Sequence, residues 1–124
     1  MGARGFTLIE LVLVLLLVTL LASLVAPVVS GGIQRAREST LKTDLHALRK
    51  ALDDYYADLG QYPAELDELV KKRYLRRIPP DPFTERRDTW IVVRAEDEAL
   101  GKGILDVRSG SSDRAADGSY LKDW

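Results

Sequence analysis

Few residues in this sequence have catalytic potential. His46 is the one histidine and there is no cysteine, so Ser-His-Asp and Cys-His sets, zinc-finger spacings and disulfides all lack the residues they need. The adjacent carboxylates Asp53 and Asp54 belong to a predicted solvated helix face rather than to a pocket. We find no glycine-rich phosphate loop in the sequence. These observations argue against an enzyme, and His46 is expected to face solvent rather than to bind a metal.

Oxygen-bearing side chains gather near the C-terminus, in residues 109–124 (SGSSDRAADGSYLKDW). Calcium prefers six to eight oxygen ligands from carboxylates, hydroxyls and carbonyls. Asp113 and Asp117, with neighbouring carbonyl groups, are candidate calcium ligands, although the spacing is not that of an EF-hand. The alternative interpretation is a turn-rich loop closed by Tyr120 and Trp124.

One further acid, Glu10, stands directly before a long apolar run. From Leu11 to Val29 no residue is charged, and 14 of these 19 residues are Leu or Val. An α-helix of about 20 residues crosses the hydrocarbon core of a bilayer. At about 0.3 to 0.6 kcal/mol for each Leu or Val, insertion is favoured by roughly 4 to 8 kcal/mol. The run therefore predicts a membrane-spanning helix, with Glu10 near its end.

A secretory signal peptide is the alternative for the same run. Arg4 is the only basic side chain before it, the run is longer than a usual signal core, and a small-x-small cleavage site is hard to place. A retained anchor is therefore favoured. Arg4 favours a cytoplasmic N-terminus, whereas Arg35 and Arg37 beyond the run oppose it, so charge alone leaves the topology open.

The residues from Gly5 to Glu10 read GFTLIE and lead into the apolar run. This stretch resembles the processing and assembly signature of type IV pilins and type II secretion pseudopilins. The resemblance implies that a membrane-embedded prepilin peptidase cuts after Gly5 and methylates the new amine of Phe6. Residues 1–5 would then be a leader, and the apolar helix would remain in the product.

The same resemblance gives Glu10 and Pro27 roles in the filament. It implies that Glu10 pairs with the Phe6 amine of a neighbouring subunit during assembly, which would offset the cost of burying an acid. The alternative is an acid at headgroup depth that contacts only water. Pro27 matches a proline of the family's helix, where the missing N–H and the ring disrupt the hydrogen-bond ladder, so a helix break is expected there.

Beyond the run, apolar residues at spacings of three and four predict an amphipathic helix that ends at Gly60. A second short helix is predicted over residues 65–72, an extended proline-rich path over 78–83, and an antiparallel hairpin from strands 89–94 and 103–107. The predicted fold class is α+β. The expected apolar stripe consists of Leu41, Leu45, Leu48, Leu52, Tyr55 or Tyr56, and Leu59.

Three short motifs follow in order, GQYP, IPPDPF and DVRSGS. With the N-terminal motif they make nearly the whole chain similar to the major pseudopilins of type II secretion, and the missing cysteine pair points the same way. The resemblance implies a pilin-like fold, with residues 6–32 as a transmembrane or filament-core helix and 33–124 as a small periplasmic domain. It also implies a calcium site in the C-terminal loop, at Asp113 and Asp117.

The expected function is structural. The resemblance implies a homopolymeric helical filament in the periplasm, built from inner-membrane subunits. Its expected partners are prepilin peptidase, minor pseudopilins and an inner-membrane assembly platform driven by a cytoplasmic ATPase. A type IV pilin for adhesion, motility or DNA uptake is the first alternative. The second is a membrane-anchored binding module that does not polymerise and uses Trp90, Phe83 and the proline loop.

Nucleic acid is not an expected partner. The 18 basic and 19 acidic residues give a formal net charge of −1, which argues against binding by bulk charge. A scattered set of arginines is expected to form a solvated face rather than a DNA-binding patch: Arg73, Arg76, Arg77, Arg86 and Arg87.

Overall fold

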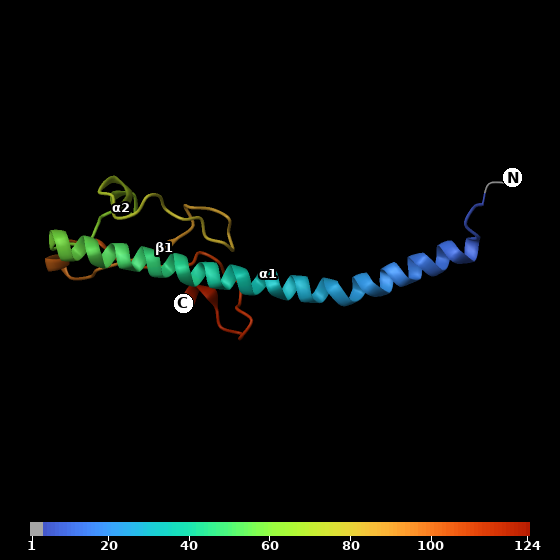
Figure 1. Cartoon of the computed structure of the whole chain (residues 1–124). Coiled ribbons are helices and arrows are strands. Elements are labelled where there is room, and N and C mark those ends of the chain that lie inside the picture. Colours follow the sequence, from blue (N-terminus) through green and yellow to red (C-terminus); the bar gives the residue numbers. More distant parts are fainter. Residues whose placement is uncertain (1–3) are drawn as a thin grey trace. The chain divides into compact units, whose positions relative to one another are not determined.

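The computed structural model describes residues 4–124 (Figure 1). A single long helix is followed by short elements that lie along its C-terminal part. In chain order the elements are α1 (Leu8–Leu59), α2 (Asp67–Lys71), β1 (Ile91–Arg94), the 3-10 turn η1 (Glu98–Leu100), β2 (Ile104–Arg108) and the 3-10 turn η2 (Leu121–Asp123).

The chain divides into two compact units after Gln34, and α1 contributes to both. In the part of α1 before the division, residues 8–34, every side chain is exposed except that of Gln34, which is half-buried. We call residues 8–34 the apolar segment and residues 35–124 the C-terminal unit. Only the C-terminal unit has a hydrophobic core of its own among the described residues.

The part of α1 inside the C-terminal unit has a buried stripe. Six residues are buried at spacings of three and four, as an amphipathic helix requires. Tyr55, and not Tyr56, completes the stripe, and Leu59 is 42% exposed, so the expected stripe is one position too long. The helix ends there because Gly60 adopts a φ of 73°, the left-handed conformation that terminates many helices. The buried residues are Leu41, Leu45, Leu48, Ala51, Leu52 and Tyr55.

The second helix is shorter than predicted. It covers Asp67–Lys71 instead of residues 65–72, with acids in its first turn and a lysine in its last, as the helix dipole favours. Leu69 is fully buried, while Leu66 and Val70 pack against the core from its edge. The proline-rich stretch that follows is not helical, and Phe83 contacts the core as expected.

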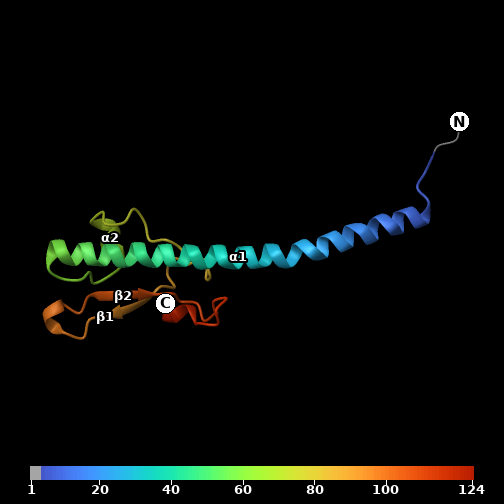
Figure 2. The same ribbon diagram turned by 60° about the horizontal axis from the view of Figure 1, so that its bottom comes forward.

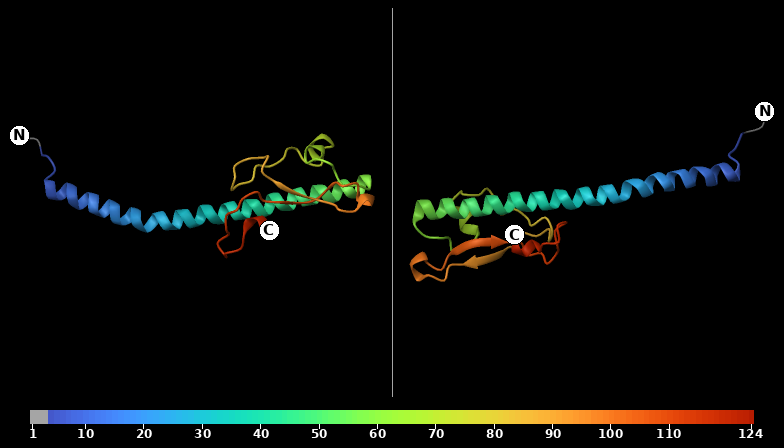
Figure 3. Two further views of the ribbon diagram at one scale, coloured as in Figure 1. Left: turned by 180° about the vertical axis from the view of Figure 1, so that it is seen from behind. Right: turned by 90° about the horizontal axis from the view of Figure 1, so that it is seen from below.

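The two strands form the predicted antiparallel hairpin. Figure 2 shows β1 and β2 as neighbouring arrows. Ile91 pairs with Arg108 and Val93 with Asp106, and the register shifts between Val93 and Arg94. The acidic connection between the strands contains η1, which Asp97 caps by accepting a hydrogen bond from the Ala99 N–H. The right-hand view of Figure 3 shows the two strands side by side, with η1 at one end of the hairpin.

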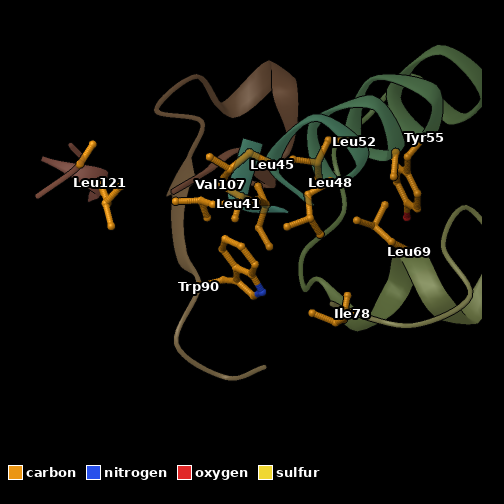
Figure 4. Packing of buried hydrophobic residues seen from close by; sticks show 13 residues of the cluster. Leu41, Leu45, Leu48, Leu52, Tyr55, Leu69, Ile78, Trp90, Val107 and Leu121 are labelled. Atoms are coloured by element: carbon orange, nitrogen blue, oxygen red, sulfur yellow. The ribbon is translucent and has the colours of Figure 1, made fainter. Parts of the chain in front are cut away.

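The core gathers side chains from α1, α2, both strands and η2 (Figure 4). Trp90 lies below the leucine stripe, and its indole Nε1 donates to the Pro79 carbonyl oxygen at 2.7 Å. Val107 and Leu121 contribute from the C-terminal end of the chain and are fully buried. The prediction of an α+β fold, with one long helix packed on a small antiparallel sheet, is confirmed.

Candidate assembly site

The predicted cleavage point lies in an exposed, non-helical segment. Residues 4–7 precede α1 and have no regular secondary structure. The Phe6 side chain is 86% exposed, and nothing lies within 4 Å of where a Gly5 side chain would begin. A protease needs an extended, accessible peptide, so the Gly5–Phe6 bond has the local structure that cleavage requires.

Glu10 lies in the first turn of α1 and forms a reciprocal pair of hydrogen bonds with Thr7. The Thr7 N–H donates to Glu10 Oε2 at 3.1 Å, and the Glu10 N–H donates to Thr7 Oγ1 at 3.2 Å. This is a capping box, which satisfies two of the N–H groups that a helix start leaves unpaired. Sequence reasoning missed this role, although the Thr-x-x-Glu spacing of residues 7–10 is its signal.

The hydroxyl groups of the apolar segment are satisfied within the helix. The hydroxyls of Thr19, Ser23 and Ser30 donate to the carbonyl oxygens of Leu15, Leu20 and Ala26, at 2.7 to 3.1 Å. They therefore leave no unpaired hydroxyl hydrogen toward lipid or toward another helix. In residues 4–124, α1 is the one helix whose length and composition suit a membrane span.

Pro27 lies inside α1 and does not end it. α1 runs from Leu8 to Leu59 with Pro27 inside it, and Figure 2 draws it as one continuous helix. The expectation of a helix break at Pro27 is therefore corrected for the single chain. A proline removes one main-chain hydrogen bond and introduces a clash with the preceding turn, but the bonds on either side can preserve the helix.

Two of the short motifs contact each other through Asp81. Its side chain is fully buried, and its Oδ2 accepts hydrogen bonds from Ser109 Oγ at 2.6 Å and from the Gly110 N–H at 3.2 Å. Its Oδ1 accepts from the Phe83 N–H at 2.9 Å. The carboxylate therefore holds the IPPDPF loop against the end of β2, a contact that sequence reasoning did not predict.

Glycines fit where main chains approach closely at the two ends of β2. A Cβ on Gly110 would overlap the Thr89 carbonyl oxygen, and one on Gly103 would overlap the main chain of Tyr62. Beside Gly103, the Ile104 N–H donates to the Pro63 carbonyl oxygen at 2.8 Å. The GQYP motif thus lies against one end of β2, and IPPDPF lies against the other.

Two of the arginines, Arg77 and Arg87, line one cavity together with Trp90. Trp90 is buried, and Arg86 forms a bidentate ion pair with Asp88 at 2.6 and 2.8 Å. This cavity of about 750 Å³ has an apolar wall and a rim of both charge signs. Its lining includes Leu66, Val70, Ile78, Trp90, Val92, Arg77 and Arg87.

The two predicted calcium ligands lie apart from any cluster of acids. Within residues 4–124 no group of three or more His, Cys, Asp or Glu side chains could hold a metal ion. Asp117 Oδ1 accepts from the Ser119 N–H at 2.9 Å and from Ser119 Oγ at 2.6 Å, and these bonds lower its pKa. The Oδ1 oxygen of Asp117 is thus engaged within its own loop. His46 is exposed, as expected, beside a cavity of about 430 Å³.

Comparison with known proteins gives a consistent result. Residues 28–120 match the family described as "Type II secretion system (T2SS), protein G". Three relatives are each named type II secretion system core protein G. That of Dickeya chrysanthemi is 36% identical over 96 residues, which covers 64% of this chain and 63% of the relative.

The other two relatives give similar values. The protein of Aeromonas hydrophila is 36% identical over 95 residues, and that of Escherichia coli (strain K12) is 35% identical over 96 residues. Both matches cover 64% of this chain and 66% of the relative. The matched part is thus under two thirds of the length of these relatives. No solved structure matches the chain significantly.

Proposed function

The chain belongs to the family of type II secretion system protein G, and from this premise we propose that it is a structural subunit that polymerises into a periplasmic pseudopilus. Many apolar helices would bundle into the core of the filament, and the C-terminal units would cover its surface. Identical contacts that do not close into a ring generate an open helix of this kind. The subunit would contribute mechanical structure and no catalysis.

The observation that carries this proposal is the contrast within α1. Its C-terminal part is buried in its own domain, whereas the side chains of residues 8–33 contact no core. A continuous apolar surface of this length is far larger than a soluble monomer normally exposes. It requires lipid before assembly and the helices of other copies afterwards, which a pseudopilin subunit would provide.

Processing at Gly5 and Phe6 would prepare the subunit. We propose that prepilin peptidase removes residues 1–5 and methylates the Phe6 amine. The exposed, non-helical segment before α1 supports access to this bond. The cut would fall two residues before Leu8, so α1 would remain whole.

Glu10 would then act in assembly. The capping box holds one carboxylate oxygen of Glu10 at the Thr7 N–H, next to the residue whose amine cleavage would free. We propose that the carboxylate pairs with the Phe6 amine of a neighbouring subunit. Charge neutralisation would lower the cost of moving both groups out of water, and one pair per subunit would fix the axial register.

The proposed location is the bacterial inner membrane, with the N-terminus in the cytoplasm and the C-terminal unit in the periplasm. The partners would be further copies of the chain, minor pseudopilins, and an assembly platform driven by a cytoplasmic ATPase. A type IV pilin would share the processing and the helix bundle. Filaments that reach the cell surface and serve adhesion or motility would favour that alternative.

Processing can be tested by the intact mass of the protein from cells that contain a prepilin peptidase. We expect the loss of residues 1–5 and the gain of one methyl group. The variant Gly5→Ala should keep its full mass and still insert into the membrane. An unprocessed parent protein, or cleavage inside the apolar segment, would contradict the proposal.

Assembly can be tested with two matched substitutions in the capping box. Glu10→Gln keeps an oxygen acceptor for the Thr7 N–H but removes the charge, so it should insert normally and lose filament formation. Thr7→Ala removes the reciprocal hydrogen bond but keeps the charge, so it should still assemble. Cross-linking of membranes, or electron microscopy of filaments, reports the result. If Thr7→Ala fails and Glu10→Gln assembles, capping and not charge is the function of Glu10.

A further inference from the structure

Arg49 connects three separate segments at the C-terminal end of the chain. Its Nε donates to Asp106 Oδ1 on β2 at 2.8 Å. Its Nη2 donates to the Val107 carbonyl oxygen at 3.1 Å and to the main-chain oxygen of Trp124 at 2.6 Å. A planar guanidinium offers several donors in a fixed fork, so one side chain of α1 holds both β2 and the last residue.

Further contacts close the same segment onto α1. Trp124 Nε1 donates to Ser119 Oγ at 2.9 Å, and Lys42 Nζ lies 4.9 Å from the centre of the Trp124 ring. The Ala116 N–H donates to Glu38 Oε1 at 2.6 Å. Leu121, in η2, is fully buried in the core. The segment from residue 109 to 124 is therefore ordered by contacts with α1.

Two carboxylates of this region, Asp106 and Asp117, each accept two hydrogen bonds at one oxygen. Asp106 Oδ1 receives both the Arg49 Nε and its neighbour's Val107 N–H. Asp117 Oδ1 receives both donors of Ser119, and Lys42 adds a smaller attraction that also lowers its pKa. A divalent cation near Asp106 would meet the positive guanidinium of Arg49. A hard cation takes six to eight oxygen ligands, and the Oδ1 oxygens of Asp106 and Asp117 already accept hydrogen bonds from within the chain.

We propose that Arg49 fastens residues 109–124, the C-terminal segment, to α1 in the place of a metal ion. The fold of this segment is then independent of calcium. The guanidinium supplies the positive charge toward Asp106 and the donors toward two main-chain oxygens. The inference concerns the fold of the C-terminal unit, and it holds whether or not the chain forms a filament.

The first test uses the unmodified full chain in detergent micelles, with thermal unfolding followed by tryptophan fluorescence. We expect the same Tm, within about 1 °C, in millimolar CaCl2 and in EDTA, and no saturable binding of calcium in equilibrium dialysis. A metal that binds only the folded state would raise the Tm with its concentration. A calcium-dependent rise of several degrees, or one tightly bound calcium per chain, would overturn the proposal.

The second test removes the guanidinium. Arg49→Met keeps the length of the side chain but leaves Asp106 and two main-chain oxygens without these donors. We expect the Tm to fall by about 5 to 10 °C, because charge-assisted hydrogen bonds to partly buried groups are among the stronger ones. Limited proteolysis should then cut within residues 109–124, where the parent chain resists.

A control variant lies one residue away on the same helix. Lys50 forms an exposed ion pair with Asp54 at 2.6 Å, so Lys50→Met removes a charge from α1 without touching the C-terminal segment. It should change the Tm by no more than about 2 °C. Arg49→Lys keeps the charge without the planar fork and should fall between the two. Equal effects of Arg49→Met and Lys50→Met on Tm and on proteolysis would refute the role of Arg49.

Discussion

The apolar segment and the C-terminal unit share one helix but obtain their stability in different ways. Along residues 8–33 every side chain is exposed, and the helix is held by its own hydrogen bonds and by the capping box at Thr7. Between Leu41 and Tyr55 the same helix has a stripe buried in a core. Identical leucines therefore have different roles, depending on whether their partners come from this chain or from its surroundings.

The largest effect on the free energy of unfolding should come from replacing a leucine by alanine, and it should differ between the two regions. Leu48 is fully buried, so Leu48→Ala should destabilise the C-terminal unit by about 2 to 5 kcal/mol through lost contacts and a cavity. Leu16 is 62% exposed, so Leu16→Ala should leave that stability unchanged. Denaturant unfolding of the full chain in detergent, followed by tryptophan fluorescence, measures both. Equal losses would show that the two regions unfold as one.

A second pair of substitutions compares two glycines that differ in the space available for a Cβ atom. Gly110→Ala would place a Cβ against the Thr89 carbonyl oxygen and should cost about 1 to 3 kcal/mol. Gly31 has no neighbour within 4 Å of its would-be Cβ, so Gly31→Ala should not lower the stability of the C-terminal unit. The same unfolding measurement applies, and a neutral Gly110→Ala would mean that the loop containing Thr89 shifts easily.

The smallest expected effect is a pH dependence of the stability of the C-terminal unit, caused by the partial burial of the Asp44 carboxyl group. Burial, and to a smaller extent the nearby Asp81, raise the pKa of Asp44 above its ordinary 3.8. The protonated form is thus favoured in the folded state, and this contribution is full below pH 3.8 and is lost as the pH rises through the folded-state pKa.

Asp44→Asn should therefore raise the Tm at pH 7 by about 1 to 4 °C, since the group is partly exposed and screened. The gain should vanish below about pH 3.8, where the parent carboxyl is protonated in both states. Thermal unfolding across this pH range measures it. Thr43→Ala, the neighbouring exposed position, is a control and should show no such pH dependence.

Local patterns in the sequence predicted the helices and the hairpin, because periodicity and turn residues act over a few positions. They also contained the Thr7–Glu10 capping box, which a search for the Thr-x-x-Glu spacing would have found. They did not predict the contact of Asp81 with Ser109 or that of Arg49 with Trp124. These pairs are 28 and 75 residues apart, and no local preference links residues at such separations.

The end of the leucine stripe was misjudged for a related reason. Leu59 continues the spacing of the stripe, but Gly60 turns the chain before a partner can cover it. Similarly, Pro27 predicted an interruption, yet the helix continues. A single lost hydrogen bond is a local cost, which the turns on either side can outweigh.

The composition of the core also has a consequence for the timing of synthesis. Its members run from Leu41 to Leu121, so a ribosome completes the leucine stripe well before it reaches η2. At about 5 to 20 residues per second, the stripe waits several seconds for its last partner. During that interval the nascent chain exposes two hydrophobic surfaces, that of the apolar segment and that of the leucine stripe. Only the second can be covered by the chain itself, so the core of the C-terminal unit cannot be complete before Leu121 has been synthesised.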